Sequence, residues 1–314
     1  MAIDNAILNS QRKADPQRGK RHRSATEIED FWTGLICLFP TVVVTLGFVI
    51  IPVAFSFYLS FHQWNILKPD KPFVGFDNYV RMFQTDEFWK ALEHTVLYTI
   101  GVVPVGLVIS LGVALLLNQR IAGLSLYRTG YFLPVVTSTI VVAVVWTWLY
   151  NPYYGLINLA LKTLGVPQPG WLTDPKWALP AIIIMSIWKN MGYHMVIFLS
   201  GLQAISSSYY EAADIDGASR LDKFRFITWP LLRPTTALVL MTSVIFSFQI
   251  FGPVYVMTGG GPMRSTTVLL YYIYQRGFEF KEMGYASAVA WVLFAIIFSL
   301  TLIQFRYSRS GAAD

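Results

Sequence analysis

Two hydrophobic stretches of the sequence carry polar and aromatic residues that recur every three or four positions, the spacing of one helix face. Hydroxyl and amide groups can hydrogen-bond to a polar solute, and an aromatic ring can stack on a flat face of it. The residues predicted to form a site for such a solute are Asn190, Tyr193, His194, Ser243, Phe246, Ser247, Gln249 and Ile250. The alternative is that the polar members only hydrogen-bond neighbouring helices together.

Residues with the types and spacing needed for catalysis or metal binding are not found in the sequence. The histidines His22, His62, His94 and His194 are scattered, and no cysteine cluster joins them. The glycines at 259–261 lack the Gly-Lys-Ser/Thr ending of a phosphate-binding loop, and they are predicted to form a flexible loop. The single cysteine, Cys37, excludes a disulfide within the chain. We predict that the chain is not an enzyme and binds neither a metal nor a cofactor.

The composition is that of a membrane protein. Hydrophobic residues make up 54% of the chain and charged residues 13%, whereas soluble domains carry about 25% charged residues. Six apolar runs are each long enough to cross a bilayer as a helix. They cover residues 31–61, 95–117, 132–150, 179–201, 235–257 and 285–305. The predicted fold is all-α with six spans, so both termini lie on the same side.

Lysine and arginine are concentrated in the polar tail 1–30 and in the segments on the same side of the predicted spans. Since basic segments stay in the cytoplasm, both termini are predicted to be cytoplasmic. The predicted organisation is a tail at 1–30, a membrane domain at 31–307 that includes a loop at 203–234, and a second tail at 308–314. The net charge of +6 does not indicate nucleic acid, because a basic tail is typical of proteins beside anionic lipid.

The stretch 208–234 is the one long polar, helix-forming segment between two spans. Its local signals predict two short helices with a bend. We expect this polar element to lie outside the membrane and to contact a partner. The signals are the capping pairs Ser208–Glu211 and Ser219–Asp222, the glycine at Gly217, and the prolines Pro230 and Pro234 as helix stops.

This segment also contains Glu211, Ala212, Ala213, Gly217, Ile227 and Pro230 at the spacing of the EAA loop. It resembles that loop in the membrane subunits of binding-protein-dependent ABC importers, although Trp229 replaces the usual leucine. Segments 73–79, 151–158 and 258–262 are similar to outer-loop segments of the carbohydrate-uptake branch. The resemblance covers residues 31–307.

The resemblance implies a type I ABC importer permease in the bacterial inner membrane, working by alternating access. The implied partners are a second homologous permease subunit, two ATPase subunits that use ATP and magnesium, a periplasmic or lipid-anchored binding protein, and membrane lipid. Aligned to the maltose branch, Tyr193, Ser243, Phe246 and Ser247 fall at sugar-site positions; Asn190 and Ile250 also align there but differ in type. The residues implied to couple to the ATPase are Glu211, Ala212, Ala213, Asp214 and Gly217.

Several alternatives stay open from the sequence. A self-contained secondary carrier or channel would need no ATPase, and a membrane-embedded enzyme would need paired catalytic groups. The solute can be an oligosaccharide, a glycosylated polyol or glycerol phosphate. Its main site can also lie in the partner permease. Lys189, within a predicted span, either pairs across the subunit interface or faces a water-filled path.

Overall fold

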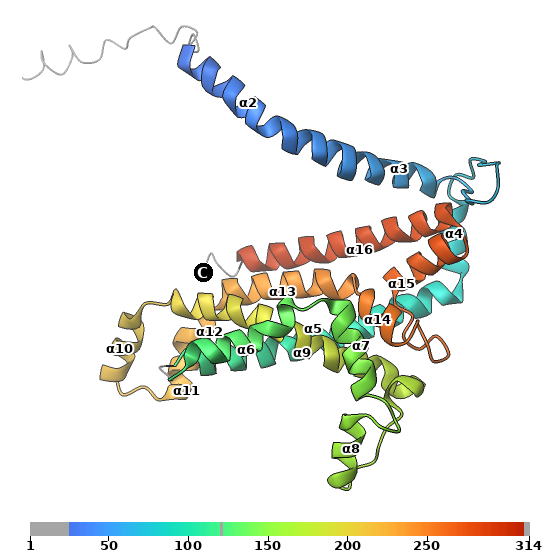
Figure 1. Cartoon of the computed structure of the whole chain (residues 1–314). Helices are drawn as coiled ribbons and strands as arrows, with labels where there is room; N and C mark the ends of the chain where they lie inside the picture. The colour runs from blue at the N-terminus through green and yellow to red at the C-terminus, as the bar shows by residue number, and fades with distance from the viewer. Residues whose placement is uncertain (1–24, 120–121, 311–314) are drawn as a thin grey trace, which may run out of the picture. The chain divides into compact units, whose positions relative to one another are not determined.

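The computed structural model describes residues 25–119 and 122–310, and helices dominate these ranges (Figure 1). The described ranges contain no β-strand, only two isolated bridges, so the predicted all-α class is confirmed. The elements are α2 Ala25–Thr45, η1 Leu46–Ile50, α3 Ile51–Ser60, α4 Asp77–Gln84, α5 Asp86–Leu117, α6 Leu124–Val136, α7 Thr139–Leu149, α8 Leu156–Thr163, η2 Trp171–Thr173, α9 Pro175–Gln203, α10 Ser207–Ile215, α11 Arg220–Lys223, η3 Phe224–Thr228, α12 Trp229–Leu231, α13 Arg233–Phe248, α14 Gly252–Met257, α15 Leu269–Tyr274, η4 Gln275–Glu279 and α16 Met283–Ser310.

The chain divides into two units at residue 55. The first unit contains α2, η1 and the start of α3. The apolar helix from Trp32 to Ser60, with a mean hydropathy of 2.6, continues across this division. Residues 1–24 of the predicted N-terminal tail lie outside the described residues. The rest of that tail, from Ala25, is already helical in α2. At the other end of the chain, α16 runs to Ser310, so the predicted boundary at 307 falls inside a helix.

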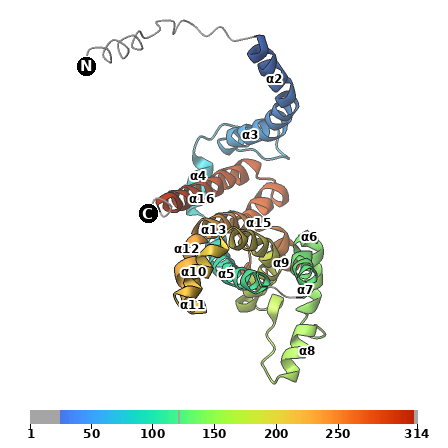
Figure 2. The same cartoon turned by 90° about the vertical axis from the view of Figure 1, so that its left-hand side faces the viewer.

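The second unit is a helix bundle in which α9 packs along α5, α6 and α13, and α13 packs along α16 (Figures 1 and 2). Helices α10 and α11 stand at one end of this bundle, and α4, α14 and α15 stand at the other. Close packing depends on small residues at the contacts. A Cβ on Gly192 of α9 would lie 2.1 Å from the carbonyl oxygen of Tyr131 of α6. The α6–α9 contact therefore requires glycine at 192.

Within residues 25–119 and 122–310, four helices are long and apolar enough to cross a membrane, and the number rises to six if each of two bent helix pairs counts as one span. The predicted run 132–150 is one of these pairs, α6 and α7, which meet at 98°. Pro134 lies in the last turn of α6, and the extended residue Thr137 ends that helix. The predicted run 235–257 is also interrupted, because Pro253 begins α14 and cannot continue the hydrogen-bond ladder of α13.

The three segments that resemble family loops are held by internal hydrogen bonds. The amide nitrogen of Asn78 donates to the carbonyl oxygens of Ser60 and His62, and the indole of Trp171 donates to Asn158 at 2.7 Å. The glycine-rich loop is also fastened, since Tyr271 donates to the carbonyl oxygen of Gly259 at 3.0 Å and neighbouring threonines bind the next two carbonyls. These contacts do not support the prediction of a flexible loop at 259–261.

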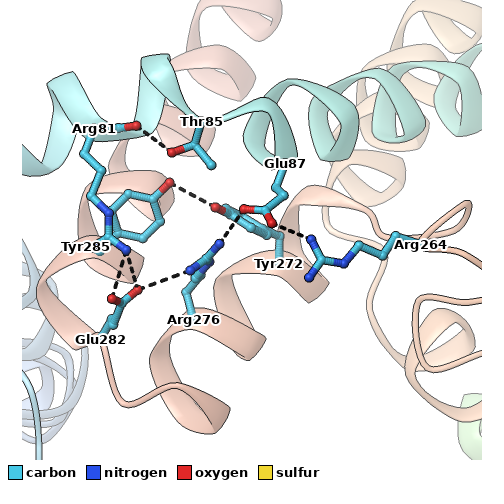
Figure 3. A network of polar contacts seen from close by, with 8 residues as sticks. All are labelled: Arg81, Thr85, Glu87, Arg264, Tyr272, Arg276, Glu282 and Tyr285. Carbon is cyan, nitrogen blue, oxygen red and sulfur yellow. Dashed lines mark hydrogen bonds and ion pairs between the residues drawn. The ribbon is translucent and has the colours of Figure 1, made fainter.

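An ion-pair network joins α4, α5, η4 and the residue before α16 (Figure 3), and α4 and α10 stand at opposite ends of the bundle (Figure 1). Arg276 is its centre: it donates to Glu87 at 2.6 Å and to Glu282 at 3.4 Å, with only 16% of its side chain exposed. Arg81 binds the other oxygen of Glu282 at 2.9 Å. Burial raises the pKa of the neighbouring Tyr272, so its hydroxyl stays protonated. The network joins α4 and α5 to η4 and the start of α16, two pairs of neighbouring elements that are far apart in the sequence.

Replacing Arg276 with methionine is expected to destabilise the bundle by about 1–3 kcal/mol, because charge-assisted hydrogen bonds to two carboxylates are lost. The apparent melting temperature of the purified protein should fall by several degrees. Arg264→Gln is the control: Arg264 also binds Glu87, but its side chain is 67% exposed, and exposed pairs contribute about 0–1 kcal/mol. Equal melting temperatures for both variants would show that Arg276 is not the centre of the network.

Candidate functional site

A cavity of about 360 Å³ lies among α5, α6, α9 and α13, inside the second unit. Its volume is within the range of small-molecule pockets. The residues that line it come from all four helices and mix apolar, aromatic and polar side chains. They are Tyr98, Val102, Val103, Gly106, Val135, Ile187, Lys189, Asn190, Tyr193, His194, Ser243, Phe246 and Ser247.

Six of the eight solute-site residues predicted from the sequence line this cavity. They are Asn190, Tyr193, His194, Ser243, Phe246 and Ser247. A hydrogen bond of 3.1 Å between His194 Nε2 and Ser243 Oγ joins α9 to α13. In contrast, 59% of Phe246 and 38% of Tyr193 are exposed. The buried pair therefore links two walls of the cavity, while the two rings line it and are partly exposed.

The other two predicted residues, Gln249 and Ile250, do not line the cavity. Helix α13 ends at Phe248, and Gln249 is its exposed C-cap residue. Ile250 is 6% exposed and belongs to a hydrophobic cluster with Val254 and Met257. The helical spacing that placed Ile250, with Gln249 beside it, fails at this break because α13 ends at Phe248.

Lys189 is the one charged side chain among the described residues that line the cavity. Its ammonium group donates to the carbonyl oxygen of Pro134 at 3.3 Å. This carbonyl lies in the last turn of α6, where carbonyls lack a donor from their own helix and cations are favourable. Lys189 thus holds the bend between α6 and α7 against α9, at the edge of the cavity.

The contribution of α5 was missed in the sequence. Tyr98, Val102 and Gly106 are spaced by four residues and line the cavity from one face of α5. A signal in the sequence that could have identified them is a tyrosine within an apolar run, followed by a glycine on the same helix face. Val135 had no signal of its own, since it enters the wall only through the packing of α6 on α9.

The connecting segment, residues 206–231, joins α9 to α13 through short helices. Ser206 is the N-cap of α10 and accepts a hydrogen bond from Ser208 N, so the predicted capping pair Ser208–Glu211 is wrong. The N-cap needs an extended backbone, which Ser206 has with ψ at 137°. The predicted capping box of Ser219 and Asp222 is present.

Gly217 of this segment has a φ of +74°, the left-handed conformation predicted for it. The helix that starts at Arg220 continues through η3 and α12 and ends at Leu231, one residue after Pro230, as predicted. Pro234 lies in the first turn of α13, where the missing N–H is not needed. Asp214, predicted to couple to an ATPase, forms an ion pair with Lys223. Tyr210 also hydrogen-bonds Thr228 at 2.9 Å, so these contacts hold α10 against α11 and η3.

Glu211 and Ala212 are exposed on α10, and Ala213 is half-buried. Glu211 forms no hydrogen bond or ion pair with the described residues. Among those residues there is also no group of three or more histidine, cysteine or acidic side chains that could hold a metal ion. The arrangement therefore offers a solute-sized cavity and, at one end of the bundle, an exposed acidic helix.

Comparisons with known proteins find relatives over most of this chain. The chain is 37% identical over 279 residues to the trehalose/maltose transport system permease protein MalF of Thermococcus litoralis, covering 88% of this chain and 93% of that protein. It is 34% identical over 299 residues to the sulfoquinovosyl glycerol transport system permease protein SmoG of Agrobacterium fabrum, covering 95% and 97%.

A solved structure, a bacterial alginate ABC transporter in complex with alginate pentasaccharide-bound periplasmic protein, has a chain with the same fold. The TM-score is 0.80 at 25% identity, over 92% of this chain and 98% of that one. Residues 95–310, which include the whole cavity and the connecting segment, match a family described as binding-protein-dependent transport system inner membrane component. The chain belongs to this family of inner membrane transport components.

Proposed function

We propose that this chain is the membrane-spanning permease subunit of an ATP-driven ABC importer that moves a sugar or sugar-like solute by alternating access. The observation that carries the proposal is the cavity among four helices, with exposed aromatic rings beside hydroxyl, imidazole and amide groups. The names of the related permeases, for trehalose/maltose and sulfoquinovosyl glycerol, support a solute with sugar chemistry.

The remaining parts of the importer come from other polypeptides. A second permease subunit completes the path, two ATPase subunits use ATP and magnesium, and a periplasmic binding protein delivers the solute. The solved alginate transporter with its periplasmic protein supports the last of these partners. We place both termini in the cytoplasm, as the lysine and arginine distribution indicates.

In this proposal the connecting segment docks on one ATPase subunit through α10. The contacts of Asp214 with Lys223 and of Tyr210 with Thr228 make α10 and α11 move as one body. Closure of the ATPase subunits then displaces α13, and the cavity wall carried by α13 shifts relative to α9. The six cavity residues predicted from the sequence bind the solute, and Lys189 positions the α6–α7 bend beside it.

The experiment that tests this proposal measures ATP hydrolysis in lipid nanodiscs by the chain co-purified with its neighbours, using a panel of solute-loaded binding proteins. Stimulation by one loaded binding protein supports the importer and identifies its solute. A chain that purifies without an ATPase and carries solute down its gradient alone would instead be a secondary carrier, and the proposal would be wrong.

Replacing Phe246 with alanine is expected to reduce solute uptake at limiting concentration about tenfold, because the ring is the most exposed aromatic face in the cavity and stacking contributes on the order of 1 kcal/mol beyond buried area. Phe246→Trp keeps a stacking face and should retain most of the uptake. Both rates are measured with labelled solute in proteoliposomes at matched protein content. Full uptake by the alanine variant would place the solute elsewhere.

A further inference from the structure

A second cavity, of about 450 Å³, lies where the connecting segment turns into α13 and the last turns of α16 close the corner. The chain bends by 63° there, between Arg220–Leu231 and α13. The lining residues belong to three elements, α12, α13 and α16. They are Trp229, Arg233, Pro234, Thr236, Ala237, Leu240, Met241, Ile303, Gln304 and Tyr307.

The walls of this corner cavity are largely apolar, and they contain one cation and no acidic side chain. Arg233 is exposed and forms no ion pair or hydrogen bond with the described residues. Trp229 and Tyr307 lie at the ends of two apolar helices, where aromatic rings are typical of the boundary between lipid tails and headgroups. The cavity thus combines an apolar floor with an unpaired positive charge at headgroup depth.

Two buried polar atoms in the same cavity have no hydrogen-bond partner: Thr236 Oγ1 and Gln304 Oε1. Such atoms are rare in folded proteins because an unpaired buried group loses its bonds to water without replacement. The Thr236 hydroxyl can donate to a phosphate or ester oxygen, and Gln304 Oε1 can accept from a hydroxyl. One ligand with an anionic group, ester oxygens, a hydroxyl and an apolar chain would satisfy all of these groups.

We propose that the corner cavity binds one anionic phospholipid, such as phosphatidylglycerol, with its phosphate at Arg233 and an acyl chain along Leu240, Met241 and Ile303. The inference rests on the proposed function, which sets the orientation of the chain in the membrane. Cytoplasmic termini put the cavity at the cytoplasmic leaflet, where basic pockets between spans bind anionic headgroups. A lipid in this corner lies against the bend that joins the connecting segment to α13, so it stiffens the path from α10 to the solute cavity.

The test is native mass spectrometry of the assembled complex, released from nanodiscs that contain equal amounts of phosphatidylglycerol and phosphatidylcholine. The wild-type complex should retain phosphatidylglycerol in preference to phosphatidylcholine. Arg233→Gln should lower that retention about fivefold, as expected for one arginine at an anionic headgroup. Arg225→Gln is the matched control, because it removes the same charge from the connecting segment outside the cavity. Ala237→Phe should expel the lipid by filling the cavity while Arg233 remains.

Equal retention of phosphatidylglycerol by the wild type and Arg233→Gln would overturn the proposal, as would equal retention of the two lipids by the wild type. The same spectra report the assembly. A complex with its ATPase subunits but without lipid contradicts only this inference, whereas the absence of any ATPase contradicts the proposed function.

Discussion

Replacing Glu211 with lysine is expected to abolish the stimulation of ATP hydrolysis by solute-loaded binding protein, while the amount of chain in the membrane stays unchanged. Glu211 is exposed on α10 and has no bond to the described residues, so its replacement removes no internal contact. Lysine is also a good helix former, and α10 should persist. A docking surface, in contrast, loses its attraction and gains a repulsion when one charge is reversed, which costs several kcal/mol in an interface.

Asp216→Lys is the matched control, since it makes the same charge change at the exposed C-cap of the same helix. A cation is favourable at a helix C-terminus, so this variant should fold and keep most of the stimulation. The two variants are compared by solute-stimulated and basal ATPase rates in nanodiscs, after confirming co-purification of the subunits with the wild type. Normal stimulation of the Glu211 variant would exclude α10 as the coupling surface.

Replacing Gly192 with alanine is expected to prevent α6 from packing on α9, with loss of most folded protein. The added Cβ would lie 2.1 Å from the carbonyl oxygen of Tyr131 and 2.9 Å from its carbonyl carbon. Backbone atoms cannot rotate away as a side chain can, so the helices must separate. Overpacking of this kind costs about 1–3 kcal/mol, and more where backbone must shift. The separation also breaks the contact of Lys189 with Pro134, which borders the solute cavity.

Gly112→Ala in α5 is the matched control, because a Cβ there meets no atom within 4 Å and alanine favours a helix over glycine by about 1 kcal/mol. The yield of monodisperse protein and its apparent melting temperature are measured for both variants. The Gly112 variant should equal or exceed the wild type, and the Gly192 variant should fall well below it. Similar melting temperatures for the two variants would mean that α6 and α9 are not in the close contact described.

The amino-acid sequence determined the class of this protein and much of its local chemistry. Apolar runs of bilayer length dictate helices, because lipid offers no hydrogen bonds to an open backbone. The capping box of Ser219 with Asp222 and the left-handed Gly217 also depend only on neighbouring residues. For the same reason the face of α9 that carries Asn190, Tyr193 and His194 was predictable, since that helix continues without a break from Pro175 to Gln203.

Tertiary structure decided where helices stop and what they face. The bend between α6 and α7 and the break after Phe248 lie in sequences that read as continuous apolar runs. Gln249 and Ile250 follow the break and lie outside the cavity, whereas the packing of α6 on α9 places Val135 in its wall. The sequence left two roles open for Lys189, a pair across the subunit interface or a position facing a water-filled path. Only the packing of α9 on α6 placed the carbonyl oxygen of Pro134 within reach of its ammonium group.

The difference between the features that the sequence determined and those that tertiary structure decided has a physical reason. Helix formation and capping are decided by interactions between residues a few positions apart, so the sequence contains them directly. A cavity depends on which helix faces meet, and in a membrane this is set by packing of small residues and by a few polar contacts between distant segments. The approach of Gly192 to Tyr131 and the hydrogen bond between His194 and Ser243 are such contacts. They exist only once the chain has folded, and they shape the solute cavity.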